Sequence, residues 1–194
     1  MSVTKKDVGY FARIIGVLLV ITMFVALLLS CVNMITKDRI AANEKAKLQE
    51  AIEKLYPDKE KLSYDKLNVS LDTKDEDVKK AFTALYIVKD DGNEIGYYAE
   101  VAPKGFNGAI KMLIGITLDG KISGIQIITH GETVGIGDKI EDKSFRGGFN
   151  GLTSTEEADD IDVITGATYS SKAVKVGVKT ALCAYSSYTG GAEQ

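Results

Sequence analysis

An apolar segment near the N-terminus constrains this chain more than any other feature of its sequence. Residues 14–36 contain no charged side chain, and most of them are large and apolar. As an α-helix with a rise of about 1.5 Å per residue, this segment spans about 34 Å, which exceeds the hydrocarbon core of a bilayer at about 30 Å. We therefore expect one transmembrane helix over residues 14–36, preceded by a cytoplasmic tail of residues 1–13.

The orientation of this segment is not decided by the basic residues around it, because they lie on both sides. They are Lys5, Lys6 and Arg13 before it and Lys37, Arg39, Lys45 and Lys47 after it. The remaining residues, 37–194, carry a formal net charge of −5. This negative balance favours a cytoplasmic N-terminus, with the soluble domain on the extracytoplasmic side of the cell inner (cytoplasmic) membrane.

A signal sequence is the second interpretation of the same segment. Residues 28–31 read Leu-Leu-Ser-Cys, which resembles a lipoprotein cleavage site and would leave a lipid on Cys31. However, Leu29 stands where a smaller residue is usual, and Val32 and Ile35 continue the apolar run past the cysteine. A spanning helix is the favoured interpretation, and a lipid-anchored Cys31 stays as the alternative.

The composition of the chain argues against several kinds of site. His130 is the only histidine, and Cys31 and Cys183 are the only cysteines. Zinc and iron–sulfur sites need three or four ligands, usually with paired spacing, which this set does not supply. We therefore expect no metal site, and any redox chemistry must come from an organic cofactor. With a net charge of −3, no Trp and no basic stripe, the chain also lacks the features of nucleic-acid-binding proteins.

Residues 37–80 are predicted to connect the membrane segment to the soluble domain by a helix and loops. Residues 37–56 have helix-forming composition and are expected to continue the membrane helix, pack one face on the domain and end near Pro57. The apolar residues of that face are Ala41, Ala42, Leu48, Ala51, Ile52 and Leu55. Residues 58–80 contain many charges and are expected to form loops.

Residues 81–189 have the pattern of one α+β domain. Four β-rich runs are expected to form two antiparallel hairpins, with turns at Asp-Asp-Gly-Asn and Asp-Gly. The runs are residues 81–88, 95–102, 110–118 and 122–129. Residues 130–160 are expected to hold at most short helices. A closing helix over residues 170–188 is expected to pack on the sheet through Ala173, Val174, Val176, Val178, Ala181, Leu182 and Tyr185.

Residues 162–171 combine a strand end, a turn and a helix start. Two β-branched residues precede a turn over residues 165–167, whose glycine allows backbone conformations that other residues avoid. Thr168 is expected just before the helix, with Ser170 or Ser171 as the N-cap. A phosphate at this place would meet free backbone N–H groups and the positive end of the helix dipole. Taken alone, the segment suits an ordinary capped helix start better.

The pattern Asp-x-x-Thr-Gly-Ala-Thr, from Asp162 to Thr168, resembles the flavinylation motif of the FMN-binding domain family. Average residue usage predicts this pattern by chance in roughly fewer than one chain in a thousand. The resemblance implies that a flavin transferase takes FMN from FAD and joins its phosphate to the Thr168 hydroxyl. It also implies that Asp162 positions or activates this acceptor. The other residues of the implied FMN site in this segment are Thr165, Gly166, Ala167 and Ser171.

Two segments upstream resemble the same family. Residues 104–108, Lys-Gly-Phe-Asn-Gly, are similar to its glycine-bracketed aromatic turn. Residues 130–137 are similar to its His-x-Glu-Thr-x-Gly-x-Gly segment, which lies by the flavin. The resemblance thus implies that His130, Glu132 and Thr133 belong to the FMN site. On the residues alone, His130 could instead hold a backbone group, and Glu132 could be a capping carboxylate.

These motifs and the single N-terminal span together imply a role in electron transfer. They are similar to those of flavin-carrying subunits of Rnf-type complexes, which are ferredoxin:NAD⁺ oxidoreductases that translocate Na⁺ or H⁺. The implied role is electron relay beside other membrane subunits of such a complex, which would hold the ferredoxin and NAD sites. Residues 135–137 read Gly-x-Gly, but they lack a third glycine and a βαβ context, so a dinucleotide site is not expected in this chain.

Three other functions stay open from the sequence. The C subunit of the Na⁺-translocating NADH:quinone reductase is homologous, although it usually carries a longer soluble region. A free-standing anchored flavoprotein reductase would act on a diffusible acceptor. A lipid-anchored binding domain without cofactor would use Thr-Gly-Ala-Thr only as a turn. Fluorescence of the denatured protein in a gel separates a covalent flavoprotein from a binding domain, and co-purifying subunits separate the other cases.

A reporter fused after Gln194 tests the predicted topology. If residues 14–36 cross the membrane once with the N-terminus inside, a reporter that works only in the extracytoplasmic space will be active, and a reporter that needs the cytoplasm will be silent. Cytoplasmic activity at this position would contradict the orientation. Labelled lipid on Cys31 would instead support the lipoprotein interpretation.

Overall fold

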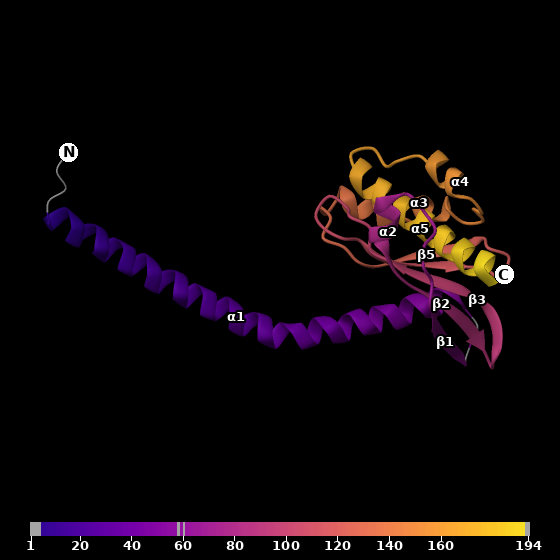
Figure 1. Cartoon of the computed structure of the whole chain (residues 1–194), viewed down its shortest axis with the longest axis horizontal. Helices are drawn as coiled ribbons and strands as arrows, with labels where there is room; N and C mark the ends of the chain where they lie inside the picture. Colours follow the sequence, from indigo (N-terminus) through magenta and orange to yellow (C-terminus); the bar gives the residue numbers. More distant parts are fainter. Residues whose placement is uncertain (1–4, 58, 60, 193–194) are drawn as a thin grey trace. The chain divides into compact units, whose positions relative to one another are not determined.

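The computed structural model describes residues 5–57, 59 and 61–192 (Figure 1). Contacts within the chain divide it into two compact units, one up to Lys45 and one from Ala46 onward. The first unit consists of most of helix α1, Lys5–Leu55. Among the described residues, α1 is the helix that is long and apolar enough to cross a membrane.

The apolar side chains of the first unit are exposed. From Phe11 to Ile40, its large apolar side chains are 40–78% exposed. Leaving apolar area in water costs about 25 cal/mol per Å², so a bilayer around residues 14–36 would be the more favourable environment. Of the tail predicted over residues 1–13, residues 1–4 lie outside the described part of the chain, and residues 5–13 are helical.

The second unit is built on a five-stranded antiparallel sheet in the order β1-β2-β3-β4-β5. The strands are β1 (Leu62–Leu67), β2 (Phe82–Asp90), β3 (Asn93–Val101), β4 (Lys111–Ile116) and β5 (Ile122–Thr129). The predicted α+β class and both predicted hairpins are therefore confirmed. Asp91 and Gly92 have φ values of 50° and 86°, as a tight hairpin turn with two positive-φ residues requires.

Strand β1 and most of helix α2 (Glu76–Ala81) lie in residues 58–80, where only loops were expected, and residues 68–75 between them have no helix or strand. Strand β1 lies at the sheet edge, and its four central residues are exposed, so it lacks the apolar alternation of a half-buried strand. Helix α2 is short and is capped by Asp75, whose side chain accepts hydrogen bonds from the Asp77 and Val78 N–H groups. Within this segment, residues 58 and 60 lie outside the described part of the chain.

One face of the sheet packs against helix α5, Thr168–Ala192 (Figure 1). Helix α2 and helix α4, Thr155–Asp160, contact α5 as well. The predicted closing helix is thus confirmed, although it begins before residue 170 and ends after residue 188. Of its predicted apolar residues, Val176 and Tyr185 are half-buried, and the other five are buried. This packing makes α5 a fixed part of the core.

The opposite face packs against the last turns of α1. Ala51 and Ile52 are buried there in a cluster with Tyr98 and other apolar residues of the sheet. Leu48 and Leu55 are half-buried, and Ala42, which belongs to the first unit, is exposed. The side chain of Ala41, which was also predicted on this face, lies outside the described part of the chain. The helix ends before Pro57, as expected.

Residues 130–160 form short helices, as predicted from their many glycines and polar residues. They are η1 (Gly137–Glu141), α3 (Lys143–Gly147) and α4. In α3, Arg146 covers the outer edge of β5, where its Nη1 donates hydrogen bonds to the Ile125 carbonyl at 2.7 Å and to Gln126 Oε1 at 3.2 Å. Because Arg146 occupies this backbone carbonyl, the edge of β5 has fewer free backbone groups that could pair with a strand of another chain.

Truncation of Ile52 tests the packing of α1 on the sheet. Ile52 is fully buried, so Ile52→Ala should lower the free energy of unfolding of the domain by about 2–5 kcal/mol, the usual cost of a large-to-alanine core substitution. Glu53→Ala, at the exposed neighbouring position, should change it by less than about 0.5 kcal/mol. Denaturant unfolding of the full chain in detergent measures both, and equal effects would contradict this packing.

Candidate functional site

The turn that precedes α5 is held by one backbone hydrogen bond and one glycine. The Ala167 N–H donates to the Ile164 carbonyl at 2.9 Å. Gly166, the third residue of this turn, has a φ of 83°. These are the features of a type II β-turn, which favours glycine at that position because a Cβ would be strained there. The turn predicted over residues 165–167 is therefore present.

Helix α5 begins at Thr168, which corrects the expectation that Ser170 or Ser171 is its N-cap. The Ser171 N–H donates to the Ala167 carbonyl at 2.9 Å, so both serines lie in the first helical turn, where they are buried. Ser171 Oγ donates to the same carbonyl at 2.9 Å and accepts from the Ile164 N–H at 3.1 Å. Ser171 thus ties the turn to the helix, a role that a serine near a helix start can also take.

The start of α5 is left without a side-chain cap. The residue before the helix is Ala167, which has no polar side chain to accept from the first N–H groups. The first N–H groups of an α-helix have no intrahelical acceptor, and they lie at the positive end of the helix dipole. Thr168 is exposed at this position. The helix start therefore offers a hydroxyl beside N–H groups that can bind an anion.

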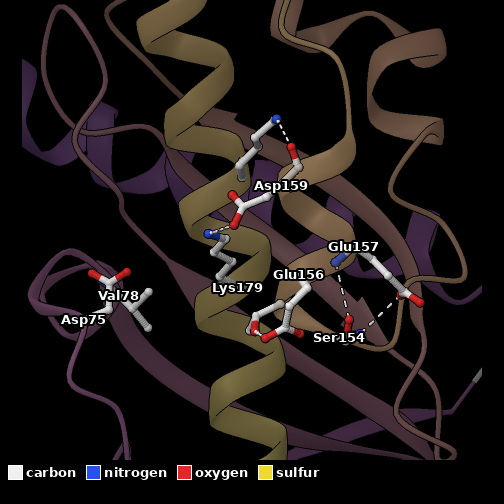
Figure 2. A network of polar contacts seen from close by, with 9 residues as sticks. Asp75, Val78, Ser154, Glu156, Glu157, Asp159 and Lys179 are labelled. Carbon is white, nitrogen blue, oxygen red and sulfur yellow. Dashed lines mark hydrogen bonds and ion pairs between the residues drawn. The ribbon is translucent and has the colours of Figure 1, made fainter.

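The segment that leads into this turn is anchored to α5 (Figure 2). Helix α4 begins with a capping box between Ser154 and Glu157. At its end, Asp159 pairs with Lys179 of α5, and the Asp159 carbonyl accepts a hydrogen bond from Lys175 Nζ at 2.9 Å. The chain between α4 and Thr168 is thus attached to α5 at both ends, which limits the positions that the turn can take.

A pocket of about 420 Å³ opens at the start of α5. It is lined by Phe106, Glu132, Thr133, Ile136, Gly137, Gly166, Ala167, Thr168, Tyr169 and Ser170. Three segments predicted from the motifs therefore meet here: residues 104–108, residues 130–137 and residues 162–171.

Two aromatic side chains lie at this pocket. The side chains of Phe106 and Tyr169 are 65% and 71% exposed, and their ring centroids are 6.0 Å apart. Tyr169 and Ser170 were not predicted as site residues, because only the tertiary packing turns the first helical turn toward the other two segments.

Glu132 and Thr133 connect these segments. Glu132 is buried, and its Oε1 accepts from the Asn107 N–H at 3.0 Å, whereas its Oε2 accepts from the Ser170 hydroxyl. Thr133 Oγ1 accepts from Asn107 Nδ2 at 3.3 Å. The Thr133 carbonyl accepts from the Gly137 N–H at 2.8 Å, which closes the loop around the carboxylate. Both residues line the pocket, and their role toward FMN stays a prediction.

His130 does not line the pocket. Its Nδ1 accepts a hydrogen bond from the Glu132 N–H at 3.1 Å, so Nε2 carries the proton of the neutral ring and donates to Glu141 Oε1, also at 3.1 Å. Both ring nitrogens are therefore used in holding the loop. This geometry favours the structural interpretation of His130 over a direct contact with a ligand.

Asp162 and Thr165 lie on the exposed approach to the pocket. Both are exposed, and neither lines it. The structure therefore leaves the Asp162 carboxylate accessible to another protein, on the same segment as Thr168. Ser171, also predicted, is buried behind the turn and contacts the pocket only through the backbone that it supports.

The residues around the pocket fit an FMN molecule. Small-molecule sites usually have volumes of about 300–1,000 Å³, and this pocket falls in that range. The start of α5 offers N–H groups for a phosphate, whereas Phe106 and Tyr169 offer aromatic surface for a ring system. The pocket therefore combines the two kinds of contact that a flavin mononucleotide needs, and Thr168 lies at the helix start that offers the N–H groups.

The pocket and a match to a known family define the class of the domain as FMN-binding. A profile of the FMN-binding domain family matches residues 105–183, which include every residue that lines the pocket. Among solved structures, the crystal structure of Shewanella oneidensis NqrC aligns with a TM-score of 0.49 and 19% identity, over 64% of this chain and 69% of that chain.

Similar proteins identify the family more closely. The G subunit of the ion-translocating oxidoreductase complex of Aliivibrio fischeri is 31% identical over 79% of this chain and 80% of its own length, and that of Vibrio atlanticus is 32% identical over 80% of each. The G subunit of the proton-translocating ferredoxin:NAD(+) oxidoreductase complex of Clostridium ljungdahlii is 37% identical over 55% of this chain and 62% of its own length. The chain belongs to the family of FMN-binding domain proteins that contains these G subunits.

Substitution of Gly137 tests the packing around the pocket. A Cβ at this position would lie 2.8 Å from the Glu132 Cβ and 3.0 Å from Ser170 Oγ, so Gly137→Ala should destabilise the domain by about 1–3 kcal/mol, as overpacking usually does. At Gly147 a Cβ would meet no atom within 4 Å, so Gly147→Ala is the matched control. Thermal unfolding of both variants decides the point, and a neutral Gly137→Ala would contradict the close approach.

Proposed function

We propose that the chain is the electron-relay subunit of a membrane-bound ferredoxin:NAD⁺ oxidoreductase that translocates Na⁺ or H⁺, and that it carries FMN as a phosphoester on Thr168. The family supports a role within an oxidoreductase complex. The name of the Clostridium relative supports ferredoxin and NAD⁺ as the substrates of that complex. Ferredoxin and NAD⁺ would bind to other membrane subunits, because this chain contains the motif of a flavin site and no dinucleotide fingerprint.

The position of Thr168 is the observation that carries this proposal. Its hydroxyl is exposed at the first position of α5, it lines a pocket that fits FMN, and it ends the pattern that begins at Asp162. None of the other threonines and serines of the chain follows this pattern. The uncapped N–H groups beside Thr168 would bind the phosphate, and the dipole of a helix of 25 residues would stabilise its charge.

The residues around Thr168 would bind the flavin ring, leave room for the phosphate and hold the segments of the site together. When bound, FMN supplies the electron-transfer chemistry. Phe106 and Tyr169 would hold its ring at the pocket mouth, and Gly166 and Ala167 leave room for the phosphate. The exposed Asp162 carboxylate would position or activate the Thr168 hydroxyl while a flavin transferase makes the ester. Glu132, Thr133 and Ser171 would keep the three segments of the site in place, and Thr165 would form part of the turn that presents Thr168. His130 would hold the loop that carries Glu132.

A covalent link suits a domain outside the cytoplasm. We place residues 1–13 in the cytoplasm, the span over residues 14–36 in the inner membrane, and the flavin domain outside. The predicted domain of residues 81–189 is extended toward the N-terminus, because β1 and the last turns of α1, within the predicted connection of residues 37–80, belong to the same compact unit. A dissociated FMN would be lost by dilution in that space, whereas an ester holds it at a fixed position. The exposed pocket mouth would then allow electron transfer to neighbouring membrane subunits without a diffusible substrate.

The attachment site is tested by substitution of Thr168. Thr168→Val keeps the shape of the side chain but removes the hydroxyl, so the covalent flavin should be lost while the domain still folds. Thr168→Ser restores a hydroxyl and should recover part of the flavin. Fluorescence in a denaturing gel measures the bound flavin, and peptide mass spectrometry locates it. FMN found on a residue other than Thr168 would contradict the assignment.

The relay function is tested in the isolated chain and in the assembled complex. The chain with FMN attached should be reduced by dithionite but should show negligible turnover with NADH or quinones, because its sequence contains a flavin motif but no dinucleotide fingerprint. In the complex, Thr168→Val should stop electron flow from ferredoxin to NAD⁺. Rapid NADH oxidation by the isolated chain would favour a free-standing reductase. Unimpaired flow in the variant complex would remove this flavin from the main path.

A further inference from the structure

Glu132 is the only charged side chain that is buried among the residues that the structure describes, and it is 6% exposed. It lines the FMN pocket at the start of α5. Burying a charged group costs free energy unless hydrogen bonds or an opposite charge compensate it. The burial of this carboxylate therefore depends on the hydrogen bonds that it accepts.

Two hydrogen bonds join this carboxylate to the other segments of the site. Oε1 accepts from the Asn107 N–H at 3.0 Å, and Oε2 accepts from the Ser170 hydroxyl in the first turn of α5. Because the two oxygens bond to different segments, Glu132 connects the aromatic turn of residues 104–108 to the helix start that carries Thr168. It is the side chain through which the ring end and the phosphate end of the pocket are held together.

The backbone leaves Glu132 little freedom. A Cβ at Gly105 would lie 2.5 Å from Glu132 Oε1, and a Cβ at Gly137 would lie 2.8 Å from the Glu132 Cβ. Glycine at both positions lets the backbone approach the carboxylate on two sides. Both residues belong to the motifs that resemble the FMN-binding family, and this packing gives a physical reason for glycine at each.

The charge of this carboxylate is not balanced by a cation among the described residues. Within that part of the chain, Glu132 forms no ion pair with Lys, Arg or His. His130 contacts the backbone N–H of Glu132, and its other nitrogen pairs with Glu141. The charge of Glu132 therefore acts on the pocket in a partly desolvated environment, where Coulomb interactions are stronger than in water.

We propose that Glu132 is a positioning residue of the flavin site, which clamps residues 104–108 to the start of α5, and that its carboxylate charge lowers the reduction potential of the bound FMN. Uptake of two electrons and one proton by oxidised FMN adds one negative charge to the flavin. A neighbouring carboxylate disfavours that added charge, so it shifts the reduction equilibrium toward the oxidised form. This inference rests on the proposed function, because it requires FMN in the pocket.

The clamp is tested without flavin, in the full chain in detergent. Lys104 is exposed beside the turn that Glu132 holds, so Glu132→Ala should accelerate tryptic cleavage after Lys104 severalfold. Cleavage after the exposed Lys121, in the β4–β5 turn, reports on general destabilisation and should change little. Glu94→Ala removes an exposed glutamate that does not line the pocket and should leave both rates unchanged. Equal acceleration at Lys104 and Lys121, or none at Lys104, would overturn the clamp.

The charge is tested by the midpoint potential of FMN in the loaded chain. Glu132→Gln keeps the shape and removes the charge, so it should shift the reduction equilibrium toward reduced FMN by about tenfold, which is about 30 mV for a two-electron couple. Glu94→Gln should not shift it. Ser170→Ala keeps the charge but removes one donor, so it should not raise the potential.

Each outcome of this experiment bears on one claim. An unchanged potential in the loaded Glu132→Gln chain would overturn the charge effect and leave the proposed function intact. An equal rise in Ser170→Ala would assign the effect to geometry, and it would also overturn the charge effect. A wild-type chain that carries no FMN after coexpression with a flavin transferase would instead overturn the proposed function, while the proteolysis result would still decide the clamp.

Discussion

The packing of α5 on the sheet is the interaction on which the rest of the site depends. The helix buries Val174, Val178 and Ala181 against the strands, so its axis and its first turn are fixed by the core. An exposed helix start would fray, whereas this one is also held by Ser171 and by the Asp159–Lys179 pair. The N–H groups and the Thr168 hydroxyl are therefore presented in a defined geometry, which an anion-binding site requires.

Helices cover both faces of the sheet that supports this site. An antiparallel sheet with one apolar face usually leaves the other face in water. Here the second face also carries apolar side chains, among them Tyr98 and Leu113, and the end of α1 covers them. The same helix thus serves two functions in different parts of its length. Its first part has the length and composition of a membrane span, and its last turns belong to the core of the domain.

Local signals in the sequence predicted those elements whose formation depends on nearby residues. The two hairpins are marked by Asp-Gly turns between β-rich runs, because few other residues tolerate positive φ values. The turn before Thr168 was predicted for the same reason, from Gly166. Strand β1 was missed because an exposed edge strand needs no apolar alternation, and because its partners in β2 lie 18 to 28 positions away, from Leu67↔Leu85 to Leu62↔Asp90. The N-cap was placed wrongly because a serine in the first turn can bond back to the preceding carbonyl instead of capping.

The sequence by itself determined the long apolar N-terminal segment, the class of the domain and the motif that ends at Thr168, because each depends on composition or on residues that are close in the chain. Only the tertiary structure decided which motif residues meet. It brought Glu132 to Ser170 across 38 positions, placed Phe106 near Tyr169, and directed His130 away from the pocket toward Glu141. The physical reason is that these contacts join segments that are far apart in the chain. The packing of α5 and the loops on the sheet sets the positions of these segments, and no local sequence pattern encodes those positions.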